Sequence, residues 1–411
     1  MNSDSIDVFR VGELSVGYMR NAYERCTGVL REVARMQTIA RPKLFGSLIS
    51  EVLNRDLCTF CGACVASCPV YILQMQDEKP TMKGKCELCQ VCYYSCSAAD
   101  FPKDDVEQAI FGRIRTADEP IGVYKTIANA RSRKQEILQK SQDGGVVTSI
   151  LGYALETGKV DAAVVTGIDK KTSWKSISSV AVDYADVLSA AGTKYTPAPT
   201  LIGLMSATQE YGKEKVAIVG TPCQIRSYRK MQTSLLGAKK LANAVSLAIG
   251  LFCMESYRYD QFIGDYLRIK GVDVSKVDRF AIKKGKFRVT IEGQEVLTVP
   301  IRELDEFVRS SCRICEDFTA EFADISVGGV GCPEGWCTVI ARTSRGQEFL
   351  TDAEKSGWIE LKPIDAGKFG MEQVLRNSAR KKTSAQQGQS TPGAYAQAAV
   401  QVRSPTREPC P

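Results

Sequence analysis

The sequence contains no histidine among its 411 residues. This absence excludes imidazole as a general base, as a metal ligand and as the activating partner of a serine or cysteine nucleophile. The chain also lacks an apolar run of about 20 residues, the length that a membrane-spanning helix needs, and its first ten residues show no apolar signal segment. We therefore expect a cytoplasmic protein whose chemistry comes from bound cofactors.

Charge and hydrophobicity are moderate. Lys and Arg (54) exceed Asp and Glu (47), which gives a net charge of +7, and 44% of the residues are hydrophobic. These values are ordinary for a soluble protein. Because the basic residues are dispersed, a solvated basic surface is favoured over nucleic-acid binding, and it would also suit an anionic ligand or an acidic partner. The length predicts more than one domain.

Cysteine, in contrast, is abundant. Sixteen cysteines without a secretion signal favour metal ligation in a reducing compartment over disulfides. Eight of them form two runs with the spacing C-x2-C-x2-C-x3-C; Pro69 follows the first run, and Ser97 stands at the equivalent position after the second. Two such runs are typical of a bacterial-type ferredoxin module with two [4Fe-4S] clusters. Structural zinc usually uses isolated C-x2-C pairs or knuckles instead.

The fourth cysteine of each run is expected to bind the cluster of the other run. The first cluster is thus predicted on Cys58, Cys61, Cys64 and Cys96, and the second on Cys86, Cys89, Cys92 and Cys68. We expect this α+β ferredoxin-like domain over residues 44–103, with short strands at 70–73 and 79–82, followed by a polar connector at 101–119.

From about residue 121 the sequence alternates between apolar, β-branched segments and helical patterns. We expect strands at 123–130, 162–167, 216–219, 245–252, 325–327 and 338–342, helices at 146–157 and 200–211, and a hairpin over 288–299. Such alternation predicts an α/β core with at least partly parallel strands. We place this domain at residues 104–377.

The two ends of the chain differ from the core in residue pattern and composition. Residues 1–43 form an expected helical segment, centred on residues 12–36, where apolar positions recur at helical spacing. Residues 378–411 are rich in Gln, Ser, Ala and Pro and poor in large apolar side chains. We therefore expect this tail to be disordered.

Four more cysteines fall together in the α/β part. Cys223 and Cys253 each follow an apolar strand, and Cys312 and Cys315 form a C-x2-C pair. Ligands of open α/β sheets gather beyond the carboxyl ends of the strands. The spacing fits a third cluster, a zinc site, or core cysteines that never meet. Two additional cysteines, Cys332 and Cys337, could be ligands or simply line the site.

Two glycine-rich stretches could contact an anionic cofactor. Residues 141–145 stand where a helix is expected to begin, and backbone N–H groups at a helix start favour an anion. In residues 328–331 the glycines would let the backbone approach a ligand closely. From spacing alone, a plain tight turn is the favoured explanation of each stretch.

Separated motifs occur in the order of a known family. They are Cys58-x2-Cys61-Gly62-x-Cys64, Gly220-Thr221-Pro222-Cys223-Gln224, Leu251-Phe252-Cys253, Cys312-Arg313-x-Cys315-x-Asp317-Phe318, Asp324-Ile325-Ser326-x-Gly328 and Gly335-Trp336-x-Thr338-Val339. In this combination, residues 44–362 resemble the beta subunit of coenzyme F420-reducing hydrogenase and its relatives among archaeal F420-dependent dehydrogenases and sulfite reductases. Gly329 departs from the pattern, since relatives often carry Asp there.

The resemblance implies one FAD and one [4Fe-4S] cluster in the α/β domain, which makes three clusters in the chain. Cys223, Cys253, Cys312 and Cys315 become the ligands of the third cluster. The implied FAD contacts are Ser141, Gln142, Gly144, Gly145, Lys194, Tyr195, Thr221, Pro222, Gln224, Gly328 and Gly331. Lys194, Arg226 and Arg229 are candidates to meet the anionic groups of coenzyme F420.

The implied activity is hydride exchange between coenzyme F420 and FAD, with single electrons passing through the clusters to partner subunits of a larger complex or to ferredoxin. Contact with a membrane, at its inner face, would come through those partners. Three alternatives stay open: a ferredoxin-linked FAD and iron–sulfur reductase of another substrate, a flavin-free electron-transfer adaptor, and a zinc-stapled interaction protein.

Overall fold

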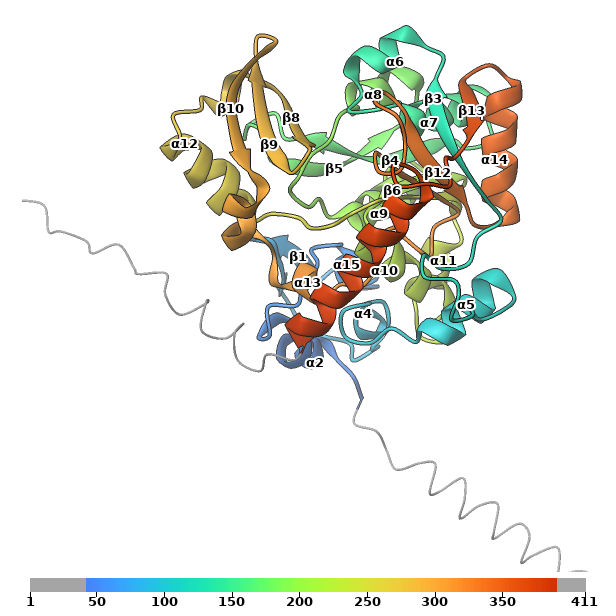
Figure 1. Cartoon of the computed structure of the whole chain (residues 1–411). Helices are drawn as coiled ribbons and strands as arrows, with labels where there is room; N and C mark the ends of the chain where they lie inside the picture. The colour runs from blue at the N-terminus through green and yellow to red at the C-terminus, as the bar shows by residue number, and fades with distance from the viewer. Residues whose placement is uncertain (1–41, 390–411) are drawn as a thin grey trace, which may run out of the picture. The chain divides into compact units, whose positions relative to one another are not determined.

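The computed structural model of the chain describes residues 42–389, so the helix expected over 12–36 lies outside the described residues. Within the described residues, the ferredoxin part and the α/β part belong to one compact unit that begins at Leu44. Its three sheets appear in Figure 1. None of the helices within residues 42–389 combines the length and the apolar character that crossing a membrane requires.

The ferredoxin part is built from short elements. They are α2 (Phe45–Leu48), a π-helical turn (Ile49–Leu53), α3 (Ala63–Ala66), β1 (Leu73–Gln76), β2 (Lys79–Met82) and α4 (Val91–Tyr94). The strand predicted at 79–82 is confirmed. The other strand begins at Leu73 rather than at residue 70, because Tyr71 adopts a left-handed conformation (φ 54°) and its N–H closes a turn onto the Cys68 carbonyl.

The stretch expected to be a polar connector contains a helix, α5 (Lys103–Phe111). Asp104 and Asp105 in its first turn suit the helix dipole, and Gly112 ends it in the left-handed region (φ 72°). The prediction is wrong here because Val106 is fully buried in the core below the central sheet, which stabilises a helix that the polar composition concealed.

The central sheet has eight strands in the order β13-β3-β12-β11-β7-β6-β4-β5. They are β3 (Thr126–Ser132), β4 (Ala162–Ile168), β5 (Ser176–Ala181), β6 (Val216–Gly220), β7 (Val245–Leu251), β11 (Ile325–Gly328), β12 (Cys337–Ala341) and β13 (Ile359–Pro363). The inner strands β11, β7, β6 and β4 pair in parallel, and the outer ones are antiparallel. The α/β core with partly parallel strands is thus confirmed.

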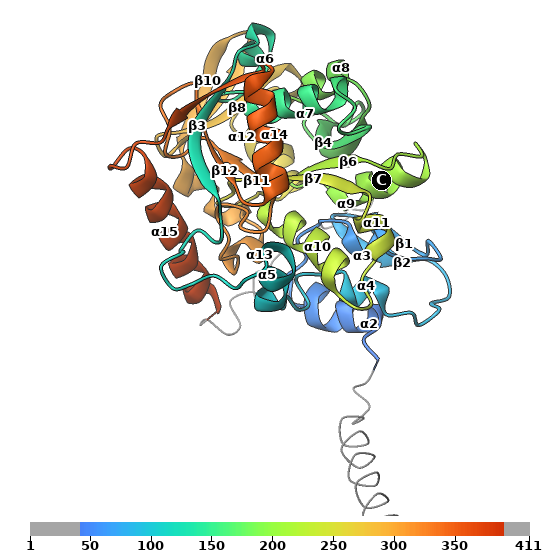
Figure 2. The ribbon, with the colours of Figure 1, turned by 90° about the vertical axis from the view of Figure 1, so that its right-hand side faces the viewer.

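Helices cover both faces of this sheet. One layer holds α6 (Gln135–Lys140), α7 (Val146–Glu156), α8 (Tyr184–Ser189) and α14 (Ser344–Lys355), and the other holds α9 (Thr200–Gln209), α10 (Pro222–Thr233) and α11 (Lys239–Ala242). Along β6 the side chains alternate between the two layers, with Ala217 and Val219 in one core and Val216 and Ile218 in the other. Figure 2 shows α9, α10 and α11 lying between the sheet and the ferredoxin part, whose residues Ala63 and Ala66 join the same core.

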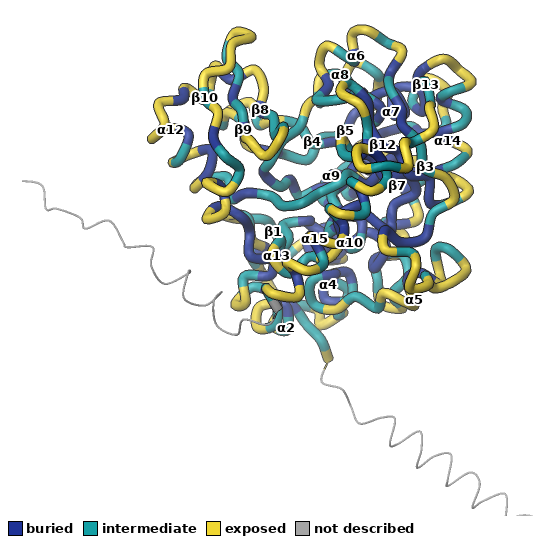
Figure 3. The backbone as a smooth tube through the Cα atoms, in the orientation of Figure 1, coloured by how far each residue is buried: buried dark blue, intermediate teal, exposed yellow. Residues whose placement is uncertain are grey.

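A small antiparallel sheet stands beside the main one. It consists of β8 (Val277–Lys283), β9 (Lys286–Ile291) and β10 (Gln294–Pro300). The hairpin predicted over 288–299 is confirmed, since Glu292 and Gly293 both take positive φ in its turn. The sheet packs on helical segments at Asp260–Tyr266, α12 (Leu267–Ile269), Val274–Lys276 and Ile301–Phe307, and α13 (Ser310–Arg313) follows. Both of its turns, at residues 284–285 and 292–293, are exposed (Figure 3).

The last element, α15 (Met371–Gln389), contradicts the expectation of disorder from residue 378. Its composition is polar, but Val374, Ser378, Lys381 and Ala385 are buried at helical spacing. The Ser378 hydroxyl also donates to the Pro120 carbonyl at 3.2 Å. Composition alone missed this helix because only a narrow stripe of it is buried.

Arg342, at the end of β12, supports a prediction about stability. Its guanidinium is 1% exposed and donates to the carbonyls of Ile121 (2.8 Å), Val123 (3.1 Å) and Thr319 (3.1 Å). Arg342→Met leaves these acceptors buried without donors, so the free energy of unfolding should fall by about 3–5 kcal/mol. Urea titration measures this, and the exposed Lys355→Met should change it by less than about 0.5 kcal/mol. Equal effects of the two substitutions would contradict the prediction.

Candidate functional site

The four cysteines predicted for the first cluster lie together. Burial raises the pKa of the Cys64 thiol well above its ordinary value, and charge on Cys96, Cys58 and Cys61 raises it further. Burial likewise raises the pKa of Cys96 to about 12, with Cys61 and Cys58 as its next causes. Thiols influence one another in this way only at short range. The fold therefore brings Cys96 from the second run to the three leading cysteines of the first.

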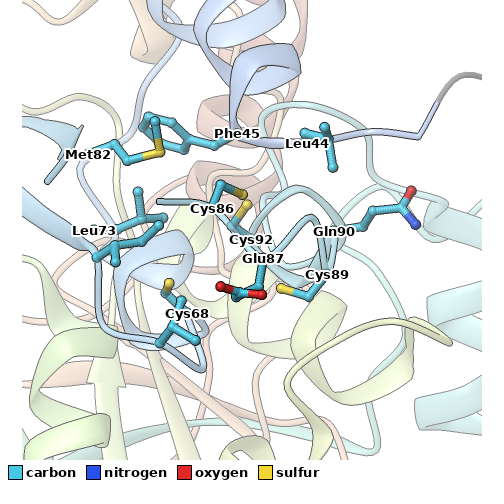
Figure 4. A pocket seen from close by; sticks show the side chains of 12 residues that line it. Leu44, Phe45, Cys68, Leu73, Met82, Cys86, Glu87, Cys89, Gln90 and Cys92 are labelled. Atoms are coloured by element: carbon cyan, nitrogen blue, oxygen red, sulfur yellow. The ribbon is translucent and has the colours of Figure 1, made fainter. Parts of the chain in front are cut away.

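The second predicted set surrounds a small pocket in the ferredoxin part. Figure 4 shows the thiols of Cys68, Cys86, Cys89 and Cys92 around this pocket, next to Phe45, Leu73 and Met82. Burial raises the pKa of Cys92 to about 11, and Cys89, Cys86 and Cys68 contribute to the rise. Cys89 is the exposed member of the set.

The third set converges from three distant segments. Cys223 lies in the first turn of α10 after β6, and Cys253 lies just beyond β7, the parallel neighbour of β6. Cys312 belongs to α13, and Cys315 follows in the next loop. Burial raises the pKa of Cys223 to about 12, and Cys315 and Cys312 add to this rise. The spacing left open that these cysteines lie apart in the core, and the fold excludes that possibility.

The donor set fits [4Fe-4S] clusters in its chemistry. All three sets consist of four cysteines with free thiols, and each thiolate of such a cluster binds its own iron. Between residues 42 and 389, no three Cys, Asp or Glu side chains are positioned to share a single metal ion.

Helix α10 connects the first and third cysteine sets. One turn after Cys223, the Ser227 hydroxyl lies 3.3 Å from the Cys61 thiol and 2.7 Å from the Ser97 hydroxyl. Ser97 in turn donates to the Cys223 carbonyl at 3.4 Å. Lys230, on the same side of the helix, donates to the Cys96 carbonyl at 3.0 Å. These contacts fix the two cysteine sets next to each other.

Cys332 and Cys337 have a different neighbourhood. Both thiols lie near Asp143, whose charge raises their pKa values after the larger effect of burial. The Gly144 N–H donates to the Cys337 sulfur at 3.2 Å. The pair thus lines the turn at 141–145 rather than completing the third set.

This turn is shaped by packing as much as by any ligand. The Ser141 hydroxyl donates to the Asp143 carbonyl at 2.9 Å, and Gly145 begins α7 with φ 69°. A Cβ atom on Gly144 would lie 2.7 Å from the Ala130 carbonyl oxygen. The glycines at these two positions are required by the fold itself.

Gln142 and Tyr195 form the contact that leads from this turn to the third cysteine set. The Gln142 amide nitrogen donates to the Tyr195 hydroxyl at 3.3 Å, while the buried Oε1 of Gln142 has no hydrogen-bond donor within the described residues. The Tyr195 carbonyl accepts from the Ser256 hydroxyl at 3.2 Å. The Ser256 carbonyl in turn accepts from the Cys312 thiol at 3.9 Å.

Lys194, the chain neighbour of Tyr195, lines a groove of about 980 Å³. Other charged residues in its wall are Lys140, Lys170, Lys171, Arg279, Asp169, Asp186 and Asp278. The Lys194 ammonium donates to the Ala190 carbonyl at 2.6 Å and to the Gly192 carbonyl at 3.1 Å, just past α8. Burial lowers the pKa of Lys194 to about 8. Its charge borders the groove while its hydrogen bonds hold the turn after α8.

The remaining predicted FAD contacts have structural partners. Thr221 caps α10, with the Gln224 side chain accepting from the Thr221 N–H at 2.7 Å and donating to the Ala198 carbonyl at 2.6 Å. Pro222 occupies the first helical turn. A Cβ on Gly328 would lie 2.2 Å from the Phe252 ring. The role of these residues as FAD contacts stays a prediction.

The other two glycines of the 328–331 stretch also have close neighbours. Gly331 has φ +83°, and a Cβ on it would lie 2.5 Å from the Val374 side chain of α15. A Cβ on Gly329 would lie 2.3 Å from the Asp143 carboxylate. The carboxylate of Asp143 thus occupies the space that the Asp of relatives would need at position 329.

Arg229 was a candidate to meet the anionic groups of coenzyme F420, and its burial contradicts this expectation. Its guanidinium is 2% exposed and donates to the Phe322 carbonyl at 2.8 Å and to the Asp324 carboxylate at 3.0 Å. Arg226 makes a cation–π contact, with its guanidinium 4.4 Å from the centre of the Phe101 ring. No local pattern around either arginine indicates these partners, because they come from distant segments.

Lys381 is the residue near the third set that sequence reasoning missed. It lies on α15, inside the segment expected to be disordered, and is 4% exposed. Its ammonium donates to the backbone carbonyls of Met254 and Cys312. Only the helical spacing of the buried positions on α15 could have revealed it.

Removing Arg229 separates its structural role from a role in binding. Arg229→Met leaves the buried Asp324 carboxylate without its cation, so the free energy of unfolding should fall by about 3–5 kcal/mol. The KM for coenzyme F420 of the remaining folded protein should stay within about twofold. The double variant with Asp324→Asn should recover part of the lost stability, because neither charge is then buried alone. A large rise in KM at unchanged stability would contradict this assignment.

Comparison with known proteins identifies the family to which the chain is similar. Residues 127–204 and 213–367 match the models of the N-terminal and C-terminal regions of the coenzyme F420 hydrogenase/dehydrogenase beta subunit, and residues 51–74 match a 4Fe-4S binding domain. The chain is 40% identical over 266 residues to the coenzyme F420 hydrogenase subunit beta of Methanothermobacter thermautotrophicus, covering 65% of this chain and 94% of that protein. It is 33% identical to a subunit of the F(420)H(2) dehydrogenase of Methanosarcina mazei, covering 74% and 84%.

A solved structure supports the same family. The F420-reducing [NiFe] hydrogenase complex of Methanosarcina barkeri contains a chain that superposes with a TM-score of 0.63 at 35% identity, covering 66% of this chain and 94% of that one. Similarity of this extent, over nearly the full length of the relatives, shows common descent rather than a shared fold alone. The chain therefore belongs to the family of coenzyme F420 hydrogenase/dehydrogenase beta subunits.

Proposed function

We propose that this chain is an iron–sulfur flavoprotein subunit that exchanges a hydride with coenzyme F420 and passes single electrons to a partner protein. Family membership supports the link to F420, and the 4Fe-4S domain supports the iron–sulfur part. The observation that carries the rest is a series of hydrogen bonds and of neighbouring thiols. It runs from Gln142 and Tyr195 to Cys312, and from Cys223 to Cys61.

We assign FAD to the region between the Gln142–Tyr195 contact and the groove that Lys140 and Lys194 line. A buried acceptor such as Gln142 Oε1 costs about 1–3 kcal/mol when it has no donor, and the N–H edge of a flavin ring would supply one. The basic side chains of Lys170, Lys171 and Arg279 suit the phosphates of FAD or the anionic tail of F420. Bound FAD would accept a hydride and release single electrons, which is the conversion required between F420 and iron–sulfur clusters.

We assign three [4Fe-4S] clusters to the three cysteine sets. The third set adjoins the FAD region through Ser256, and the first set adjoins the third through Ser227 and Ser97. These contacts place successive sets next to one another, which keeps the path for electrons short. The same series serves either direction of transfer.

The second cysteine set is the proposed contact with the redox partner. Cys89 is exposed, and Val70 and Met82 beside the same pocket are 41% and 45% exposed. Exposed apolar side chains grouped in this way are typical of a protein contact site. The relatives named above are themselves subunits, one of a hydrogenase and one of a dehydrogenase.

Anaerobic reconstitution with iron, sulfide and FAD tests the proposal. Reduced coenzyme F420 is added with a viologen dye as the electron acceptor, and the absorption band of oxidised F420 is followed. We expect rapid return of this band, lost when FAD is stripped and restored when it is added back. A preparation that contains FAD and a full cluster complement but does not oxidise reduced F420 would refute the F420 assignment.

A cysteine substitution tests the third cluster separately. Cys253→Ser should lower the iron content by about one third, since four of about twelve irons per chain would be lost. The ferredoxin clusters should remain visible by EPR after dithionite reduction, and F420-dependent dye reduction should stop. Cys332→Ser is the matched control, because that cysteine lies at the 141–145 turn, and its iron content should equal that of the wild type. Iron loss in Cys332→Ser instead would reverse the ligand assignment.

A further inference from the structure

Within the described residues, no carboxylate forms an ion pair with the buried ammonium of Lys381, and Glu255 acts on it only from beyond ion-pair distance. The ammonium is held by two backbone carbonyls, from Met254 next to Cys253 and from Cys312. Carbonyl oxygens satisfy its donors but do not neutralise its charge, and burying an uncompensated charge is costly. Its neighbour Lys382, by contrast, pairs with the Glu321 carboxylate at 3.4 Å. An anionic group therefore belongs beside Lys381.

The third cysteine set supplies that group. Cys253, Cys312 and Cys315 all interact electrostatically with Lys381, and a [4Fe-4S] cluster held by four thiolates is anionic. Reduction by one electron makes it more negative by one charge. A fixed cation in a buried setting stabilises this reduced state more than the oxidised one.

We propose that Lys381 is a positioning residue that raises the reduction potential of the third cluster. The proposal rests on the proposed function, which assigns that cluster to Cys223, Cys253, Cys312 and Cys315. One electron enters the cluster from the donor and no proton moves, because Lys381 keeps its proton throughout. The two carbonyl contacts also hold the Cys253 and Cys312 segments against α15. The matched family models end at residue 367, so Lys381 lies beyond the region that defines the family.

The test is a redox titration of the full chain, reconstituted with iron and sulfide and followed by EPR with chemical mediators. Neither FAD nor F420 is needed, so the result is independent of the substrate. In Lys381→Met, the equilibrium constant for one-electron reduction of the third cluster should fall about tenfold, which equals about 59 mV. Lys381→Arg keeps the charge and should restore the wild-type potential. A fall of less than twofold in Lys381→Met with full iron content would overturn the proposal.

Arg380→Met is the matched control. It removes the same charge one residue earlier on α15, where the side chain is exposed, and solvent screens its effect. Its potential should equal that of the wild type, and an equal shift in both variants would overturn a specific role for Lys381. If Lys381→Met loses the third cluster, Lys381→Arg decides: retained iron at the wild-type potential supports the proposal, and loss in both overturns it. Wild-type protein that binds iron for only two clusters would instead refute the third cluster itself.

Discussion

The buried ion pair between Arg229 and Asp324 anchors the helix on which the site depends. Asp324 precedes β11 and also accepts the Ala248 N–H of β7 at 2.9 Å, so the pair ties α10 to two strands of the central sheet. With its middle fixed, α10 holds Cys223 at the carboxyl end of β6. A shift of this helix would move Cys223 away from Cys253 and Ser227 away from Cys61 together.

The same helix explains why the ferredoxin part and the α/β core form one unit. Ser227 and Lys230 contact the segments of Cys61 and Cys96. Two ion pairs form further links between the same two parts: Arg258 pairs with Asp56, and Arg309 pairs with Glu78. Since Arg309 immediately precedes α13, which carries Cys312, both attachments place a predicted ligand of the third cluster against the ferredoxin part.

Sequence predicted those parts of the molecule whose causes are local. The ferredoxin spacing and the buried strands β6 and β7 carry their own signals in a few residues, and the resemblance supplied the grouping of Cys223 with Cys312. What it missed depends on distant partners. In the sequence, Lys381 and Arg229 resemble surface cations. Only the fold shows that Lys381 donates to the Met254 carbonyl and Arg229 to the Phe322 carbonyl. Helix α5 is stabilised by the buried Val106 and by Ile110 and Phe111, which pack against the same core; its polar composition does not reveal this packing.

The uneven exposure of the cysteines sets the order in which air would damage the protein. Cys64 is buried, whereas Cys89 is open to solvent, so dioxygen arriving from outside reaches the second cysteine set first. Oxidation of cysteine sulfur follows accessibility, so Cys89 is the most vulnerable cysteine of the described residues. The proposed partner surface around Cys89 would thus also be the oxygen-sensitive one, and a partner bound there would protect it.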